Sequence, residues 1–185
     1  MPPRHRKTRR TYNEPGHAHL LTFSCEQRWP LLVRDGIRRL FLEAVDRTRR
    51  RQDVALLAYV IMPEHAHLLV WPRRSEYRID EFLYSVKRPV SFQVKQLFRA
   101  GGSRRWLDRL TVRRGKQEVF RFWLAGGGHD RNLVRREQLW PVIDYLHANP
   151  VRRGMVARPT DWPWSSARYW LLGDRSVLEM DSIDA

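Results

Sequence analysis

The sequence predicts an α+β fold: a ferredoxin-like, split βαβ antiparallel sheet with helices on one face, followed by a C-terminal helix and a Trp-rich tail. Three observations predict it. The expected elements follow the order strand, helix, strand, strand, helix, strand. Two apolar runs, 54–62 and 65–72, are separated only by the turn-forming pair Pro63-Glu64, as in a hairpin. Two longer segments have apolar residues at helical spacing.

The first half of the chain supplies a strand, a helix and the central hairpin. The apolar run LLTFSC, residues 20–25, predicts the first strand, which ends before a turn at Arg28-Trp29-Pro30. Residues 34–52 predict a helix, because apolar side chains recur on one stripe while arginines occupy the opposite face. Asp35 is suited to cap the start of this helix.

The second half begins with a helix over 79–99, which Pro89 is expected to kink or break. A basic stretch, 99–116, follows and is either solvated surface or a loop that grips a nucleic-acid strand. The alternating segment EVFRFWL, residues 118–124, predicts the fourth strand.

Glycines at 126–128 then permit a loop that swings or closely approaches a ligand. A last amphipathic helix is expected over 136–149, ended by Pro150. The expected boundaries are a basic disordered arm (1–15), one folded domain (16–172) and an acidic flexible tail (173–185).

The composition points to a cytoplasmic protein with an anionic partner. Lys and Arg total 35 against 20 acidic residues, for a net charge of +15. Because the basic residues lie within aromatic-bearing segments, they favour a nucleic-acid surface over disordered tails. A single cysteine excludes an internal disulfide and a Cys-based zinc finger, and it fits a reducing compartment. No apolar run approaches the ~18 residues of a membrane span.

Two histidines open the second strand of the central hairpin. His65 and His67 are two residues apart, so on a strand they point to the same face. Such a pair can hold a divalent cation between neutral ring nitrogens and leave positions open for phosphate oxygens. The alternative is a pair of polar residues at the mouth of a strand. The same five letters, HAHLL, also occur at His17–Leu21, so the histidine pair alone does not identify the site.

Longer motifs resemble a known family. The segment VIMPEHAHLLV, with NPVRRG at 149–154 and DWPWSSA at 161–167, is similar to the REP-associated tyrosine transposases, which are HUH single-strand DNA transposases. The resemblance covers about residues 16–169. It implies that His65 and His67 hold Mg²⁺ or Mn²⁺ against a scissile phosphate, and that His17 and His19 are a structural copy.

The resemblance also implies a tyrosine nucleophile that forms a 5′-phosphotyrosine link. We expect this tyrosine directly after the glycine run, where the chain has His129 instead. His129 is therefore a third metal ligand, a nucleophile itself, or the mark of a chain that binds DNA or RNA without cleaving it. On a helix, Asn132 would share a face with His129 and reach the metal. We interpret Tyr145 as core packing, not as a substitute nucleophile.

The resemblance implies DNA as the partner, either single-stranded or folded into hairpin repeats, in a bacterial cytoplasm. The leading hypothesis is a transposase-like protein that cleaves and rejoins such DNA, and its rival is an inactive binder. Whether the chain forms a homodimer is left open. The arginines expected on the DNA path are Arg104, Arg105, Arg113, Arg114, Arg131, Arg152 and Arg153.

Overall fold

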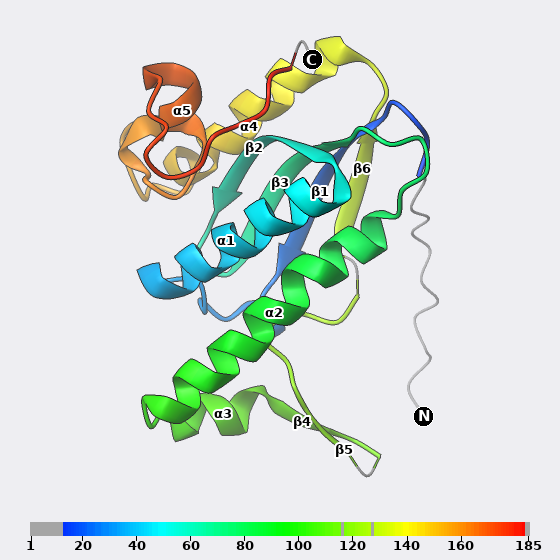
Figure 1. The fold of residues 1–185 in the computed structure, drawn as a ribbon. Coiled ribbons are helices and arrows are strands. Elements are labelled where there is room, and N and C mark those ends of the chain that lie inside the picture. Colours follow the sequence, from blue (N-terminus) through cyan, green and yellow to red (C-terminus); the bar gives the residue numbers. More distant parts are fainter. Residues whose placement is uncertain (1–12, 116, 127, 184–185) are drawn as a thin grey trace, which may run out of the picture.

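A four-stranded antiparallel sheet is the centre of the molecule (Figure 1). The computed structural model describes residues 13–115, 117–126 and 128–183. The strand order is β2-β3-β1-β6, which is the order of a ferredoxin-like sheet, so the predicted fold class is confirmed. The sheet strands are β1 (Ala18–Ser24), β2 (Val54–Ile61), β3 (His65–Pro72) and β6 (His129–Leu133).

β1 is a central strand and connects the two halves of the sheet. Its neighbours are β3 on one side and β6 on the other, both antiparallel. Thr22 lies opposite His67 on β3 and opposite His129 on β6. Side chains directly opposite one another point to the same face of a sheet, so these three residues form one row across it. The row spans two strand spacings, or roughly 10 Å between the outer backbones.

Two helices cover one face of the sheet, as predicted. They are α1 (Asp35–Gln52) and α2 (Ile79–Ala100), and they pack beside each other. The main core lies between them and the sheet and includes Phe23, Phe41 and Phe82, all nearly without exposed surface. The expected break at Pro89 does not occur, because α2 continues through it to Ala100. No helix among the described residues is long and apolar enough to cross a membrane.

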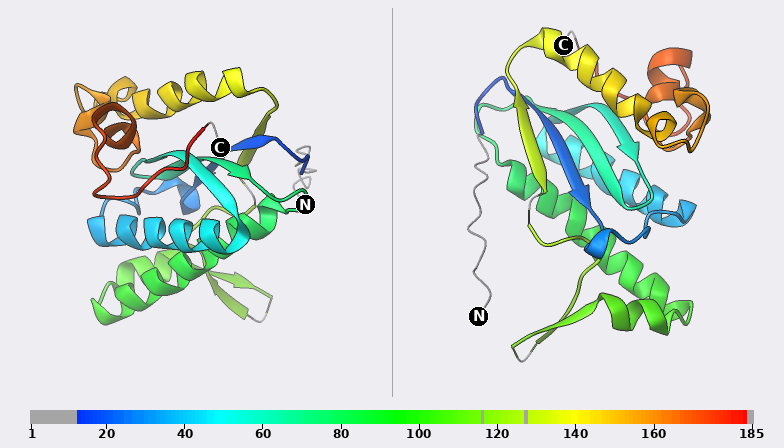
Figure 2. Two further views of the ribbon diagram at one scale, coloured as in Figure 1. Left: turned by 45° about the horizontal axis from the view of Figure 1, so that its top comes forward. Right: turned by 180° about the vertical axis from the view of Figure 1, so that it is seen from behind.

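A third long helix, α4 (Leu139–Arg152), covers the opposite face (Figure 2). Its buried stripe of Leu139, Val142, Ile143 and Leu146 packs against sheet residues such as Leu20 and Leu69 in a second core. The sheet is therefore enclosed on both sides. β3 contributes Ala66 and Leu68 to the first core, and its alternate residues point toward α4.

The fourth strand is not the segment that the sequence predicts. Residues 117–120 form β5 (Gln117–Phe120), which pairs only with β4 (Thr111–Arg114) in a separate hairpin. This hairpin and the short helix α3 (Arg104–Leu110) extend from the C-terminal end of α2, on the side away from α4 (Figure 1). The basic stretch is thus a folded projection instead of a loop. The fourth strand of the sheet is β6, in a segment between the glycine run and the last helix for which the sequence predicted no strand.

The short elements complete the fold. They are the 3-10 turns η1 (Glu26–Arg28), η2 (Arg136–Gln138) and η3 (Pro159–Asp161) and the helix α5 (Ala167–Leu172). Most of the expected basic arm, residues 1–12, lies outside the described residues. Its last part is bound, because the amide of Ile79 donates to Asn13 Oδ1 at 3.1 Å.

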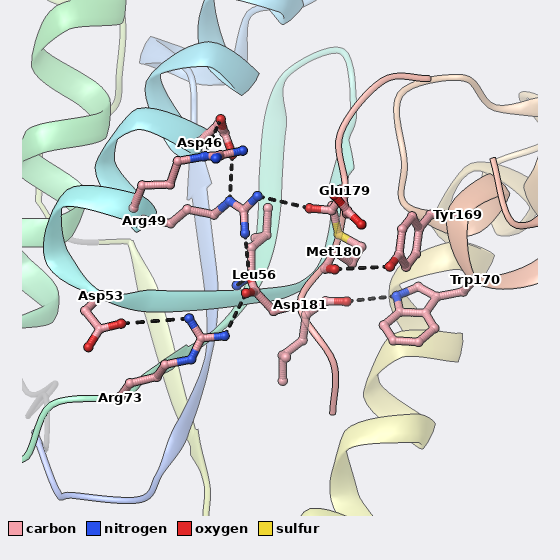
Figure 3. A network of polar contacts seen from close by, with 12 residues as sticks. Asp46, Arg49, Asp53, Leu56, Arg73, Tyr169, Trp170, Glu179, Met180 and Asp181 are labelled. Carbon is pink, nitrogen blue, oxygen red and sulfur yellow. Dashed lines mark hydrogen bonds and ion pairs between the residues drawn. The ribbon is translucent and has the colours of Figure 1, made fainter. Parts of the chain in front are cut away.

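The C-terminal tail packs along β2 and does not extend from the molecule as expected (Figure 3). Asp181 pairs with Arg49 and with Arg73, which neutralise its charge. The amide of Leu56 donates to Asp181 Oδ2 at 2.8 Å, and the amide of Asp181 donates back to the carbonyl of Leu56 at 2.9 Å. β2 is an edge strand whose free backbone groups need partners: the tail provides them at Leu56, and residues 164–166 provide them at Tyr59 and Ile61.

Candidate functional site

The imidazoles of His65 and His67 face each other through their Nε2 atoms, which are 3.0 Å apart. Each Nδ1 atom has a partner of its own. Nδ1 of His65 donates to the carboxylate of Glu64 at 2.8 Å, and Nδ1 of His67 lies 2.7 Å from the Thr22 hydroxyl. A hydroxyl both donates and accepts, so Thr22 can serve either tautomer of His67. Both Nε2 lone pairs can therefore be turned toward one point.

The surroundings keep this pair neutral. Burial lowers the pKa of His67 to about 3. Burial also lowers the pKa of His65, although the carboxylate of Glu64 opposes the change. Burial tends to raise the pKa of Glu64, but hydrogen bonds from Arg153 and His65 bring it below its ordinary value. Neutral imidazoles oriented by hydrogen bonds at Nδ1 are the form that binds metal ions.

The residues present fit a divalent cation only in part. Two convergent imidazole nitrogens with oriented Nδ1 atoms are suited to it. No group of three His, Cys, Asp or Glu side chains suited to a metal occurs among the described residues, so the remaining ligands would be oxygens of another kind.

One such oxygen lies on α4. Asn149 is four residues after Tyr145, whose ring contacts His67, and four before Arg153, which pairs with Glu64. Residues four apart share a helix face, so Asn149 faces the histidine pair. Its Nδ2 donates to the carbonyl of Tyr145 at 2.8 Å, which leaves Oδ1 without a recorded partner among the described residues.

Tyr145 is not core packing, and that interpretation of the sequence is wrong. Its side chain is 44% exposed. Its ring lies edge-on to His67, with 6.4 Å between the ring centroids, and the guanidinium of Arg152 lies 5.3 Å from its centroid. The helical period of the segment could have predicted that Tyr145 is exposed. The buried residues of α4 form one stripe, and Tyr145 lies about 120° away from the centre of that stripe.

A cavity of about 750 Å³ opens beside Tyr145 and His67. It lies between α4 and the sheet row described above, and both Thr22 and His129 contribute to its wall. His129 is exposed at the start of β6. The structure therefore brings His129 into the same cavity as His67, but as a strand residue. The other lining residues include Leu20, Arg131, Arg135, Gln138 and Val142.

Asn132 lies on the other face of the sheet, so the expectation that it shares a face with His129 is wrong. The segment is a strand, in which residues three apart point in opposite directions. Asn132 lies opposite His19 on β1, and its Nδ2 is 3.3 Å from Nδ1 of His17. Sequence spacing placed the two residues together only because a helix was assumed.

The first HAHLL copy is part of the interior. His19 has no exposed surface; its Nδ1 lies 2.9 Å from Asp130 Oδ1 and its Nε2 lies 2.8 Å from the Tyr77 hydroxyl. Tyr77 in turn donates to the carbonyl of Glu14 at 2.8 Å. His19 therefore joins the N-terminal segment to the sheet, on the face away from His67.

The predicted DNA-binding arginines fall into two groups. The first group adjoins the site: Arg131 lines the cavity, Arg152 lies over Tyr145, and Arg153 pairs with Glu64. Arg104, Arg105 and Arg113 are exposed on α3 and β4, in the projection beyond α2. Arg114 belongs to β4, but its side chain lies outside the described part of the structure.

Comparisons with known proteins support the fold. No protein-family model matches the sequence, and no curated protein matches it. The solved structure of a REP-associated tyrosine transposase bound to a REP hairpin is similar, with a TM-score of 0.67 at 18% identity, covering 96% of this chain and 93% of that chain. The crystal structure of a presumed transposase from Deinococcus radiodurans R1 matches with a TM-score of 0.43 at 19% identity, over 76% of this chain and 98% of that chain. The fold that the sequence motifs implied is thus confirmed.

Proposed function

We propose that this chain is a transposase-like nuclease that binds hairpin-forming single-stranded DNA and cleaves it with Tyr145. One observation carries the proposal: an exposed phenol lies against His67, whose Nε2 converges with that of His65. A candidate nucleophile and one candidate metal ligand, His67, thereby line one cavity, and the second candidate ligand, His65, adjoins His67. The structural neighbour that was solved with a REP hairpin supports a hairpin as the class of substrate.

His65 and His67 would hold a divalent cation through their Nε2 atoms, and Oδ1 of Asn149 is the candidate third ligand on the protein. Such an ion, Mg²⁺ or Mn²⁺, stabilises negative charge on the phosphate oxygens. Glu64 fixes the ring of His65 through Nδ1, and Arg153 holds Glu64 in turn. Asn132 has no part in this set, because it faces the other side of the sheet.

The reaction would be an in-line displacement at phosphorus. The Tyr145 oxygen forms a bond to the phosphorus while the bond to the 3′ oxygen of the preceding nucleotide breaks. The phenol proton is lost to solvent, and the released 3′ oxygen takes up a proton. The product is a 5′-phosphotyrosine link and a free 3′ hydroxyl, and attack by that hydroxyl on the link rejoins the strand without an external energy source.

Positive side chains around the cavity would bind the DNA backbone. Arg152 places its guanidinium over Tyr145, and Arg131 lines the cavity wall. His129, exposed beside them, is well placed to donate a hydrogen bond to a phosphate. We assign His129 this supporting role because Tyr145, and not His129, contacts the metal-binding pair.

The test is to trap the covalent intermediate. A labelled hairpin oligonucleotide with unpaired flanks is incubated with the full chain and Mn²⁺, and the products are separated on a denaturing gel. The expected result is a covalent band that Tyr145→Phe abolishes and His129→Ala retains, with Tyr84→Phe as a control for another exposed tyrosine. The link should survive acid, because a phosphotyrosine is acid-stable and a phosphohistidine is not.

Two results would overturn this assignment. An acid-labile band that depends on His129 would make the histidine the nucleophile. No band with either Mn²⁺ or Mg²⁺, together with a salt-sensitive mobility shift of intact DNA, would leave a protein that binds DNA without cleaving it.

A further inference from the structure

We infer that Trp29, Trp106 and Arg109 form a stacking platform for unpaired nucleotides that flank the hairpin, reached from the histidine pair by way of Arg28. The inference rests on the proposed function, because it names how the same site holds part of its substrate. The platform combines two elements far apart in the chain: the η1 turn after β1, and α3 on the projection beyond α2.

The platform is built from two indoles and one guanidinium. The rings of Trp29 and Trp106 meet edge-to-face with 5.3 Å between their centroids. The guanidinium of Arg109 lies 5.4 Å from the ring centroid of Trp29 and 5.8 Å from that of Trp106. Both indoles are partly exposed, and Arg109 is exposed. Indole rings and guanidinium planes are the groups on which unpaired bases stack without regard to sequence.

This platform is joined directly to the histidine site. The amide of Cys25 donates to the carbonyl of Glu64 at 2.8 Å, and the amide of Leu32 donates to the carbonyl of Pro63 at 2.9 Å. The segment from Cys25 to Leu32 is therefore fastened to the turn that carries His65. Arg28 is the last residue of η1, so it lies within this fastened segment and directly before Trp29. A strand whose phosphate lies at the histidine pair would meet Arg28 and then Trp29.

The backbone of η1 is strained where this path begins. Gln27 and Arg28 have φ angles of 50° and 55°, in the left-handed region that residues other than glycine rarely adopt. Both side chains are exposed, so burial does not account for the strain. Strain of this kind concentrates at sites where a side chain must be held in a particular direction.

The charge of this region also lacks compensation. Arg28, Arg104, Arg105 and Arg109 appear in none of the ion pairs recorded for the part of the chain that the structure describes, although Asp108 lies on the same short helix. Some arginines elsewhere are paired, as Arg49 is with Asp181 and Arg168 with Asp174, so the free charge here depends on position and not on residue type. Exposed cations left free beside aromatic rings match a polyanion that also carries bases.

Packing alone explains only part of the arrangement. Trp29 and Trp106 contact the main core with their inner edges. Arg109, however, is exposed and caps both rings from outside, where a core needs no cation. The matched case is Arg88, whose guanidinium lies 5.5 Å from the ring centroid of Tyr84 on α2. Like Arg109, it takes part in no ion pair among the described residues.

Binding of flanked and bare hairpins tests the platform. Affinities are measured by fluorescence anisotropy in a Tyr145→Phe background, so that the DNA remains intact. Oligonucleotides carry several unpaired nucleotides on the 5′ side, on the 3′ side, or on neither, and a further set has abasic flanks. Removing one stacking group costs about 1–3 kcal/mol, so Arg109→Ala and Trp106→Ala should weaken binding of a flanked hairpin about tenfold. Both should leave bare hairpins unchanged, and Arg88→Ala should change neither.

A photo-crosslink provides a second readout that does not depend on whether Trp106→Ala folds. Iodouracil is placed at successive flank positions of the oligonucleotide, which is then cross-linked to the parent protein. The cross-linked peptides should contain Trp29 or Trp106. When the flanks are abasic, Arg109→Ala and the parent should bind the hairpin with the same affinity. Equal affinity of parent and Arg109→Ala for every flanked hairpin, or cross-links only outside these peptides, would overturn the platform. If the parent chain still forms the covalent band, the proposed function stands; if the parent forms no band, the function itself fails.

Discussion

The ring of Tyr145 lies edge-on to the ring of His67, at 79° and with 6.4 Å between the centroids. This relationship joins two elements that are far apart in the chain, β3 and α4, across the face of the sheet that α4 covers. It depends on the rotation of α4: the stripe from Leu139 to Leu146 is buried, so the flank that carries Tyr145 faces the cavity. The packing of the helix therefore sets the position of the candidate nucleophile.

Glu64→Gln should weaken Mn²⁺ binding by about 10- to 100-fold. The carboxylate of Glu64 accepts from Nδ1 of His65 and so fixes the ring with Nε2 toward His67. An amide oxygen accepts less strongly and the amide group can turn over, so the orientation is lost. Isothermal titration calorimetry with Mn²⁺ measures the change.

The matched control is Glu43→Gln, which removes an exposed carboxylate on α1. Its Mn²⁺ affinity should equal that of the parent. Cleavage by Glu64→Gln should return at high Mn²⁺ concentration if the residue acts through His65. Equal affinity of Glu64→Gln and the parent would remove Glu64 from the metal site.

Gly128→Ala should destabilise the fold by about 2–4 kcal/mol and release β6 from β1. Gly128 has a φ of +79°, and a Cβ there would overlap the carbonyl oxygen of Thr22 and lie 2.9 Å from Cβ of Phe23. Gly126→Ala is the matched control: its φ is +102°, but its Cβ would meet open space. Chemical denaturation compares the two variants, and an equal loss in both would show that crowding against β1 is unimportant.

The segments that bury apolar surface were predictable from the sequence. β1, β2, β3 and the three long helices occur where alternation or helical period predicts them, because these patterns report which face meets a core. The turn at Pro63-Glu64 and the shared direction of His65 and His67 followed from the same pattern. The family resemblance then selected the second HAHLL copy over the first, which is buried around His19.

The main misplaced element is a strand of the sheet whose residues are mostly polar. β6 has the sequence HDRNL, with one buried apolar residue, and so gives no strand signal. The residues around Val119 do alternate between apolar and polar, as a strand does, but they form the β4–β5 hairpin and not a strand of the main sheet. Tyr145 was missed for two reasons. Tyrosine is common in protein cores, and the nucleophile was expected directly after the glycine run. The direction in which Tyr145 faces on α4 was not considered.

Stability should fall as the pH decreases from about 6.5 to 4, and His147 should account for part of the loss. Burial lowers the pKa of His147 to about 4, while its Nε2 lies 2.8 Å from the Ser166 hydroxyl. The unfolded chain binds a proton on this imidazole at its ordinary pKa and the folded chain does not, so acid favours unfolding. The stabilisation is complete above pH 6.5 and is lost toward pH 4, by about 3 kcal/mol at most.

Urea denaturation of the parent and of His147→Gln from pH 7.5 to 4 measures this contribution. The variant should be less stable at pH 7.5 but lose less stability on acidification, so the two curves converge. Parallel curves would mean that other groups cause the acid sensitivity.

Asp181→Asn should lower the free energy of unfolding by about 1–3 kcal/mol and expose the tail to proteases. The carboxylate pairs with Arg49, which is largely buried, and with Arg73, while the amide of Leu56 donates to it (Figure 3). Asparagine keeps an acceptor for Leu56 but removes the charge that both guanidiniums face.

Asp108→Asn, at an exposed carboxylate without a recorded ion pair in the described residues, is the control. A variant as stable and as protease-resistant as Asp108→Asn would mean that the apolar anchors Met180 and Ile183 suffice to hold the tail.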